Sequence, residues 1–546
     1  MLAQLIWARI LIQWFGTSSL TIATALAASL AGLAIGATLF RRPSAFMTQW
    51  LGHATRRPGL LLLLAGIFAI EGSTLFALGD FFLPFILSVF PANVALVIVA
   101  TLALVPLNIA LGGVLPTLIQ SAGTESTKTV GTLYAAETLG GAAGALLAGL
   151  WMIQNVGLAI TLLTAAMIAI IVGAKAVFRS KAEQADKEVL DLQKVQDEKA
   201  ASAVSTAGVR TAILAAIYLA GVASLSMEIV WQRALILMVG TDTHSYMIVA
   251  VSFLIGVAVG SYLCGQLLPQ RRHNLFSFLQ LGVAFTSLAA MALFCGLVSV
   301  EGQRWLMGAT SGFEVVSKRF LASFGLLILP SCLTGASFPA AVSMLVQSGI
   351  TNADATGRSY ATIAAGNIAG VIIVGFWLIP IAGLQTSLII LAGVAVVAAA
   401  IATTRWNLSF LFAGVAVLLA GGYLFTAQQP IGLMELSSNQ SIAFYREGPV
   451  ATVSVVAEND NPSTDVASRR MVVDGIVIGE NLGGVDEKQK MLAHLPLLIH
   501  AMSNADSPSK LNAISIGLGT GILAGELAVQ PTICLLYTSP SPRDRG

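Results

Sequence analysis

The sequence predicts a polytopic α-helical membrane protein with two repeated six-helix halves plus an extra helix, followed by a small β-hairpin unit and the start of a Rossmann-like α/β domain. Three observations predict this fold class. Of the 546 residues, 56% are hydrophobic and 10% are charged, whereas soluble domains carry about 25% charged residues. The mean hydropathy is +0.83. Long apolar runs recur, and two patterns repeat far apart in the chain.

The apolar runs have the length of membrane helices, which need about 20 residues to cross a bilayer. The predicted spans are residues 2–15, 18–40, 59–79, 93–119, 130–152, 155–178, 211–238, 243–267, 275–298, 319–346, 358–380, 384–403 and 407–426.

An internal repeat divides these spans into two halves, residues 1–178 and 211–426. "IWARILIQWFGT" from Ile6 resembles "VWQRALILMVGT" from Val230, at an offset of 224. "GTLYAAETLGGAAGALLAGLW" from Gly131 resembles "GRSYATIAAGNIAGVIIVGFW" from Gly357, at an offset of 226. Parallel duplication of this kind occurs in transporter folds. Residues equivalent to 211–225 are not found in the first half, so we expect an incomplete N-terminus.

A polar linker, residues 179–210, joins the halves. Arg41, Arg42, Arg56 and Arg57 flank one short loop, and the equivalent loop of the second half is also basic. The positive-inside rule places both loops and the linker in the cytoplasm of a multi-pass protein in the lipid bilayer. The net charge of +2 indicates no nucleic-acid partner. The spacing of the four cysteines fits neither a disulfide framework nor a zinc site, so we expect no metal.

Ionisable residues inside apolar spans are candidates for a transmembrane polar site, because charge in lipid is costly and often functional. They are Glu71, Glu137, Glu228 and Arg233. Glu228 and Arg233 have polar counterparts in the first half, which favours a structural role in the bundle. Glu137 has no acidic counterpart at Ile363, so it is the stronger transport-site candidate.

Beyond Ser441 the pattern is that of a soluble domain. "VATVSVV" alternates as a strand does, and "MVVDGIVI" predicts a hairpin around Asp474-Gly475 within a unit at residues 441–482. "DEKQKMLAHLPLLIHAM" has helical spacing with an apolar face. In "ISIGLGTGILAGE", glycines between a strand and a helix can approach a nucleoside ligand closely. The predicted binding residues are Gly517, Leu518, Gly519, Thr520 and Gly521.

"FYREGPVATVSVV", "RRMVVDGIVIGE", "MLAHLPLLIH" and "ISIGLGTGILAG" resemble spermidine synthases (polyamine aminopropyltransferases). The membrane part resembles the bacterial branch in which a transporter-like region is fused to such a domain, which implies the bacterial inner (cytoplasmic) membrane. The resemblance implies aminopropyl transfer from decarboxylated S-adenosylmethionine to a polyamine-type amine, with no bound prosthetic group. Three positions depart from the family: Thr520 replaces an acidic residue, Ile478 a glutamine, and Lys488-Gln489 a Tyr-His pair. An S-adenosyl site is therefore better supported than putrescine specificity.

The end of the chain predicts an incomplete Rossmann-like start at residues 483–533 and a non-native tail at residues 534–546. We therefore assign no catalytic residue and expect no transferase activity from the chain as written. Two alternatives stay open: a membrane transporter with a nucleoside-sensing domain, and an S-adenosylmethionine-dependent methyltransferase. Thirteen spans would place the C-terminal domain outside, although its expected donor is cytosolic. The sequence indicates no oligomeric state.

Overall fold

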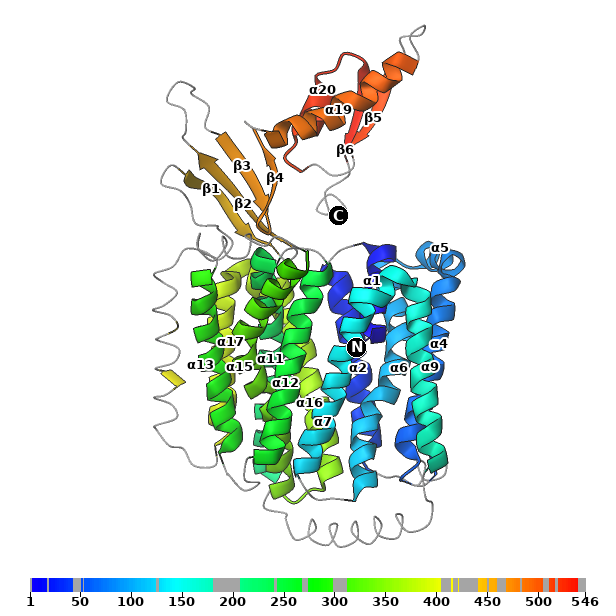
Figure 1. Cartoon of the computed structure of the whole chain (residues 1–546), viewed down its shortest axis with the longest axis vertical. Coiled ribbons are helices and arrows are strands. Elements are labelled where there is room, and N and C mark those ends of the chain that lie inside the picture. Colours follow the sequence, from blue (N-terminus) through cyan, green and yellow to red (C-terminus); the bar gives the residue numbers. More distant parts are fainter. Residues whose placement is uncertain are drawn as a thin grey trace. The chain divides into compact units, whose positions relative to one another are not determined.

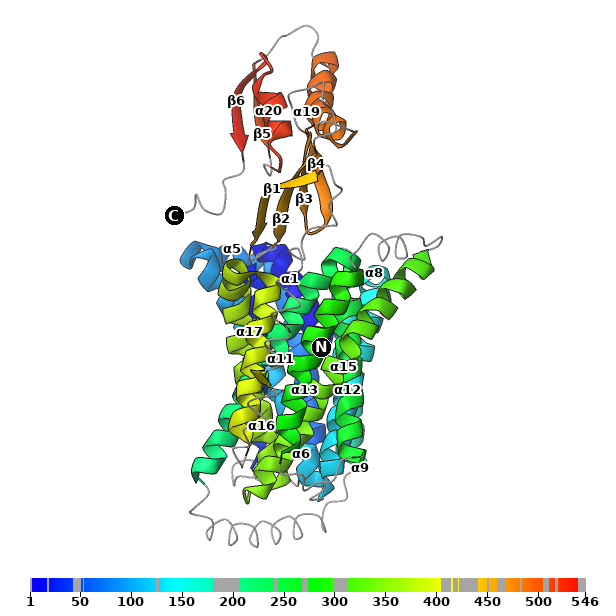
Figure 2. The same cartoon turned by 90° about the vertical axis from the view of Figure 1, so that its left-hand side faces the viewer.

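A computed structural model describes residues 2–16, 19–42, 51–52, 54–123, 127–179, 207–239, 243–267, 274–297, 312–403, 414–415, 421, 440–448, 451–458, 468–481, 484–503, 510–515 and 519–538 (Figures 1 and 2). The chain divides into two compact units, a membrane unit (Met1–Gln429) and a C-terminal unit (Pro430–Gly546). The predicted linker at 179–210 and the predicted span at 407–426 lie almost wholly outside the described residues.

The membrane unit is a bundle of long helices that run roughly parallel or antiparallel to one another (Figure 1). Its first half contains α1 (Leu2–Phe15), α2 (Ser19–Phe40), α4 (Arg57–Ala77), α5 (Gly79–Val89), α6 (Ala92–Ala122), α7 (Thr127–Leu147), the π-helical turn η1 (Ala148–Met152), α8 (Ile153–Asn155) and α9 (Gly157–Arg179). Its second half contains α11 (Ala207–Val239), α12 (Thr243–Leu267), α13 (Leu275–Leu297), α15 (Gly312–Gln347), α16 (Asn352–Ile373), the π-helical turn η3 (Val374–Leu378) and α17 (Ile379–Ala402).

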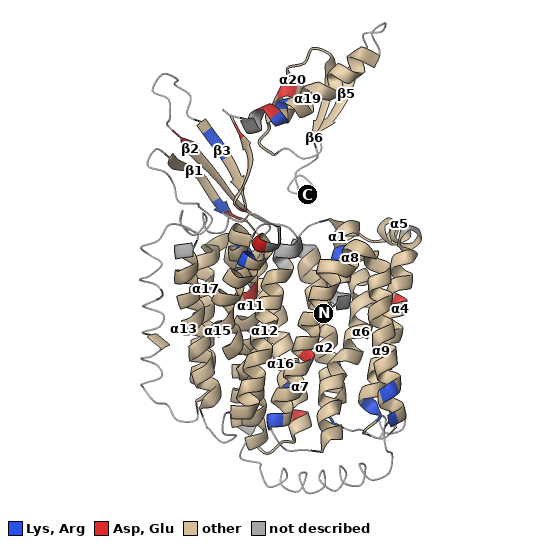
Figure 3. Ribbon diagram, viewed as in Figure 1, with Lys and Arg blue, Asp and Glu red and all other residues tan. Residues whose placement is uncertain are grey.

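The helices confirm a multi-pass membrane protein. Within the described ranges, ten helical segments are long and apolar enough to cross a membrane, and one of them joins α16 to α17. Charged residues are sparse between the helix ends (Figure 3). One helix was not predicted: α5 has 11 residues, too few to cross a hydrocarbon core of about 30 Å at about 1.5 Å per residue.

The internal repeat is visible in the backbone. Both η1 and η3 interrupt their helices at positions 226 residues apart. The glycines that follow them, Gly157 and Gly383, have φ of 80° and 79°, values that suit glycine better than other residues. Helix packing repeats as well: α2 lies against α6, and α12 lies against α15. These features support the predicted duplication.

The two halves contact each other through two pairs of helices. Helix α16 of the second half packs on α2 of the first, and α7 of the first half packs on α12 of the second. We call these contacts the α2–α16 junction and the α7–α12 junction. In each, a glycine allows close approach to a carbonyl oxygen: a Cβ on Gly357 would lie 2.7 Å from Ala37 O, and one on Gly131 would lie 2.7 Å from Ser261 O.

The C-terminal unit contains two small sheets. Strands β1 (Gln440–Glu447), β2 (Thr452–Glu458), β3 (Ser468–Val473) and β4 (Ile476–Glu480) form an antiparallel meander in the order β1-β2-β3-β4. Asp474 and Gly475, between β3 and β4, have φ of 50° and 81°, as a type I′ turn requires. The predicted hairpin is confirmed.

Helix α19 (Gly484–Ser503) follows, then β5 (Leu511–Ser515), α20 (Ile522–Ala528) and β6 (Ile533–Thr538), with β5 and β6 parallel. Among the described residues this is one βαβ unit and not a doubly wound sheet. Strand β6 includes Cys534–Thr538, the first residues of the predicted tail, and whether the tail is non-native stays a prediction. The predicted apolar face of α19 is exposed at Met491, Leu492, Leu495 and Leu498.

Candidate functional site

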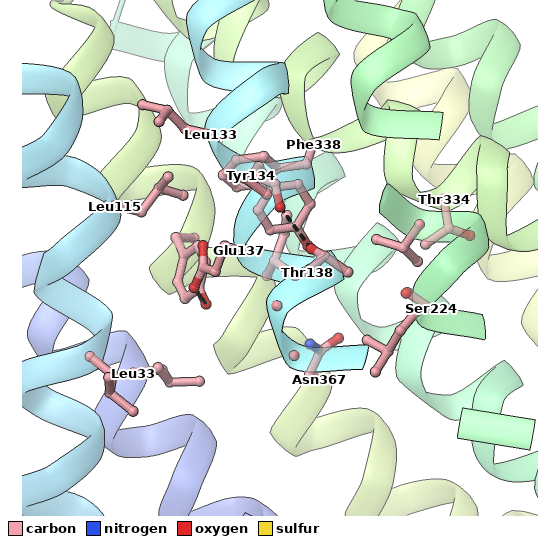
Figure 4. Close-up of a pocket in the computed structure, with 18 of the residues that line it drawn as sticks. Leu33, Leu115, Leu133, Tyr134, Glu137, Thr138, Ser224, Thr334, Phe338 and Asn367 are labelled. Carbon is pink, nitrogen blue, oxygen red and sulfur yellow. Dashed lines mark hydrogen bonds between the residues drawn. The ribbon is translucent and has the colours of Figure 1, made fainter. Parts of the chain in front are cut away.

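A cavity of about 850 Å³ lies inside the membrane unit and is lined by helices from both halves. Figure 4 shows Tyr134 and Glu137 projecting into it from α7, with Phe338 against Tyr134. Ligand pockets in proteins typically enclose about 300–1,000 Å³. The cavity therefore has the size of a small-molecule site.

Three of the helices that line this cavity carry its polar and aromatic residues at helical spacing. The lining residues of α7 include Tyr134, Glu137, Gly141 and Gly144, those of α11 include Gly221, Ser224 and Glu228, and those of α16 include Tyr360, Ile363 and Asn367. Spacings of three and four residues bring side chains onto the same face of a helix. The periodicity explains why Glu137 and Glu228, on different halves, line the same space.

Aromatic rings form one part of the wall. Tyr134 stacks on Phe338 with ring centroids 4.2 Å apart, and Phe338 meets Tyr360 edge to face at 6.0 Å. Tyr360 Oη donates a hydrogen bond to Glu137 Oε1 at 3.2 Å. Tyr134 and Tyr360 are equivalent in the repeat, so both halves contribute a tyrosine to the same wall.

The predicted polar residues separate into two groups. Glu137 and Glu228 line the cavity; Glu71, which is exposed on α4, and Arg233, which is half-buried on α11, are not among its lining residues. The described lining residues include two carboxylates and no lysine, arginine or histidine.

Sequence analysis missed a charged cluster at the α2–α16 junction. The carboxylate of Asp354 is 2% exposed and receives Arg41 Nη1 at 2.5 Å, Arg42 Nη2 at 2.7 Å and Arg358 Nε at 3.1 Å. Thr351 caps α16 by accepting a hydrogen bond from Asp354 N. Two of the arginines and the aspartate come from different halves, so this cluster ties the halves together at one end of the bundle.

The glycine loop of the C-terminal unit is only partly described, because Gly517 and Leu518 lie outside the described residues. Gly519 and Gly521 have φ of 55° and 80°, so this loop uses conformations that favour glycine. Thr520 Oγ1 donates to Gln489 Oε1 at 2.6 Å, and Gln489 Nε2 donates to Ile478 O at 2.8 Å. Three positions that depart from the synthase pattern are thus neighbours.

A second contact joins the two helices of this unit. His494 Nε2 lies 3.0 Å from Glu526 Oε2, which links α19 to α20. His494 thus packs α19 against α20. Cys534 is exposed, whereas Cys264 is buried in the membrane unit.

Comparison with solved structures finds chains of similar architecture. A structure of the proton:xylose symporter XylE of the major facilitator superfamily, bound to 6-bromo-6-deoxy-D-glucose, aligns with 79% of this chain and 93% of its own, at 11% sequence identity and a TM-score of 0.41. A likeness of this size does not by itself define a fold or a substrate. No protein-family model and no curated protein matches the sequence. The resemblance to spermidine synthases stays a prediction.

Proposed function

We propose that the membrane unit is a solute transporter whose substrate binds in the cavity between the two halves. One observation carries this proposal: the cavity is lined by both repeated halves and contains charged side chains deep within apolar helices. Substrate sites of duplicated transporters lie near the middle of the membrane at the border between repeats. Ionisable residues at such a depth commonly mark a pathway for a substrate or an ion.

Transport through such a site requires that it open to each side of the membrane in turn. Rocking of one half against the other would do this, with movement at the α2–α16 and α7–α12 junctions. Both junctions include a close helix contact at a glycine. Close glycine contacts of this kind are common between membrane helices.

Two-sided access can be tested without knowing the substrate. In a variant in which Cys264, Cys295, Cys332 and Cys534 are replaced by alanine, Ser224→Cys places one thiol in the cavity lining. We expect a membrane-impermeant maleimide to label this thiol in right-side-out and in inverted vesicles, because each orientation is populated.

Ser387→Cys in the same background is the matched control, because Ser387 is fully buried on α17 and does not line the cavity. It should stay unlabelled. Labelling of Ser224→Cys from one side only would contradict transport and indicate a receptor-type site.

We propose a second function for the C-terminal unit, the binding of a thioadenosyl nucleoside such as S-adenosylmethionine or its decarboxylated form. The observation that favours it is the β5–glycine loop–α20–β6 arrangement, with Gly519 and Gly521 in left-handed conformations. The bound nucleoside could serve three functions left open by the sequence: aminopropyl transfer, methyl transfer or nucleoside sensing.

Calorimetric titration of the purified full chain with decarboxylated S-adenosylmethionine, S-adenosylmethionine and methylthioadenosine separates aminopropyl transfer from methyl transfer by the donor that binds. We expect binding of at least one nucleoside, and its loss in Gly519→Ala, because alanine disfavours positive φ. Gly525→Ala is the control, since a Cβ there meets nothing within 4 Å. No binding of any of the three at millimolar concentration would overturn this second proposal.

A further inference from the structure

We propose that the cavity selects organic cations, specifically amines that carry hydrocarbon chains or rings. This inference rests on the proposed transport function and names its substrate class. Four properties of the cavity lead to it: its charge, its aromatic wall, the direction of its hydrogen-bond donors, and its apolar remainder.

The charge of the cavity is one-sided. Glu137 comes from α7 of the first half and Glu228 from α11 of the second, and the described lining residues contain no basic side chain. Glu137 is exposed and Glu228 is half-buried, and both border the cavity. A carboxylate at this depth in a membrane is costly unless a positive charge or a proton accompanies it. An ammonium group in the cavity would supply that charge, whereas an anionic substrate would add to the repulsion.

The aromatic wall adds a second preference for cations. Tyr134, Phe338 and Tyr360 form a continuous group of rings, and the hydroxyl of Tyr360 is bonded to Glu137. The faces of such rings attract cations, and this attraction increases where water is excluded. An ammonium group near Glu137 would therefore be close both to a carboxylate and to aromatic rings.

Two of the lining amides each use a hydrogen-bond donor within the wall. Asn108 Nδ2 donates to Leu104 O at 2.8 Å, and Gln280 Nε2 donates to Ser337 Oγ at 3.0 Å. Asn367 Oδ1, by contrast, has no hydrogen-bond partner among the described residues. This oxygen is an acceptor that suits an ammonium group, which has donors and no acceptor.

The remaining lining is hydrocarbon. Leucine, alanine and phenylalanine side chains from six or more helices make up most of it. Such a surface favours substrates that bury carbon atoms as well as a charge. A small inorganic cation would leave this surface without a partner, so the substrate class is an organic amine.

Binding to the purified full chain in nanodiscs tests this class with matched probes. Phenethylamine and spermidine represent amines of low and high charge, 3-phenyl-1-propanol is a neutral probe, and 3-phenylpropanoate is an anion. We expect at least one amine to bind about tenfold or more tightly than the neutral and anionic probes, because charge-assisted hydrogen bonds are the strong ones.

Variants locate the binding. Glu137→Gln and Glu228→Gln should each weaken amine binding about tenfold, and Tyr360→Phe should weaken it less because the ring is kept. Glu71→Gln is the matched control: Glu71 also lies in an apolar helix but does not line the cavity, so its binding should be unchanged. A thermal-unfolding midpoint near that of the parent chain shows that a variant is folded.

The outcomes separate this inference from the transport proposal. Two-sided labelling of Ser224→Cys together with preferred binding of the neutral or anionic probe would overturn the substrate class alone. Amine binding with labelling from one side only would uphold the cation site and overturn transport. Equal weakening by Glu71→Gln and Glu137→Gln would place the binding elsewhere and overturn the site.

Discussion

The α2–α16 and α7–α12 junctions are equivalent in the internal repeat and differ mainly in charge. Both place a glycine of one half against a carbonyl oxygen of the other half. At the α2–α16 junction, Arg41, Arg42 and Arg358 surround Asp354. The equivalent positions at the α7–α12 junction are Gly265, Gln266, Thr132 and Lys128.

The polar contacts across the α7–α12 junction are longer, and those described join uncharged groups. Ser261 Oγ donates to Gly131 O at 3.1 Å, and Gln266 Nε2 donates to Thr132 Oγ1 at 3.3 Å. The comparison separates two contributions to the contact between the halves, close helix packing and buried charge. Close helix packing is common to both junctions, whereas the charged cluster is an addition at one of them.

The largest expected effect is the loss of the buried carboxylate. Asp354→Asn leaves three arginines facing one another, and removing one partner of a buried ion pair typically costs about 3 kcal/mol. The unfolding free energy, measured in mixed micelles, should fall accordingly. Lys128→Gln, at the equivalent position of the other junction, is the control and should change it little, because Lys128 is exposed. Similar losses in both variants would contradict the proposed asymmetry.

A smaller effect should be shared by both junctions. Gly357→Ala and Gly131→Ala each introduce a methyl group into a contact too close for it, and overpacking costs about 1–3 kcal/mol. The two variants should lose similar stability in the same unfolding measurement. Gly325→Ala on α15 has open space for its Cβ and should instead gain up to about 1 kcal/mol from helix propensity. A loss confined to Gly357→Ala would show that only the charged junction depends on close packing.

The smallest effect tests whether the charge can be transferred. Lys128→Asp combined with Gln266→Arg introduces an ion pair at the α7–α12 junction. Its coupling energy in a double-mutant cycle should be about 0.5 kcal/mol, because exposed ion pairs contribute little. A coupling as large as that of Arg41 with Asp354 would show that burial does not account for the difference between the junctions.

Much of the fold was predictable from local patterns. Hydrophobic runs and the two repeated motifs indicate the helices and their duplication, and Asp474-Gly475 indicates the hairpin. Helix α5 was missed because its apolar run is shorter than a membrane span. The start of α16 was placed six residues late because "NADATG" is polar, although Thr351 caps the helix and Asn352 begins it.

The sites were less predictable, because their partners are distant in sequence. Glu137 was chosen for lacking an acidic repeat counterpart, and the structure places it in the cavity with Glu228; its role stays a prediction. Arg41 and Arg42 were assigned to a basic cytoplasmic loop, but their partner Asp354 is more than 300 residues away. One difference between the repeats could have indicated this cluster: the basic Lys128 of the first half is replaced by the acidic Asp354 in the second.

The packing of α7 on α12, a helix of the other half, also has a consequence for biosynthesis. Helix α12, its main neighbour, ends at Leu267, 120 residues after the end of α7 at Leu147. At roughly 5–20 residues per second, α7 therefore waits on the order of ten seconds for its partner. During this interval the face of α7 that later packs on α12, with Gly131 and Ala142, needs a temporary neighbour such as the insertion machinery. Synthesis of the middle of the chain is therefore the vulnerable stage of assembly.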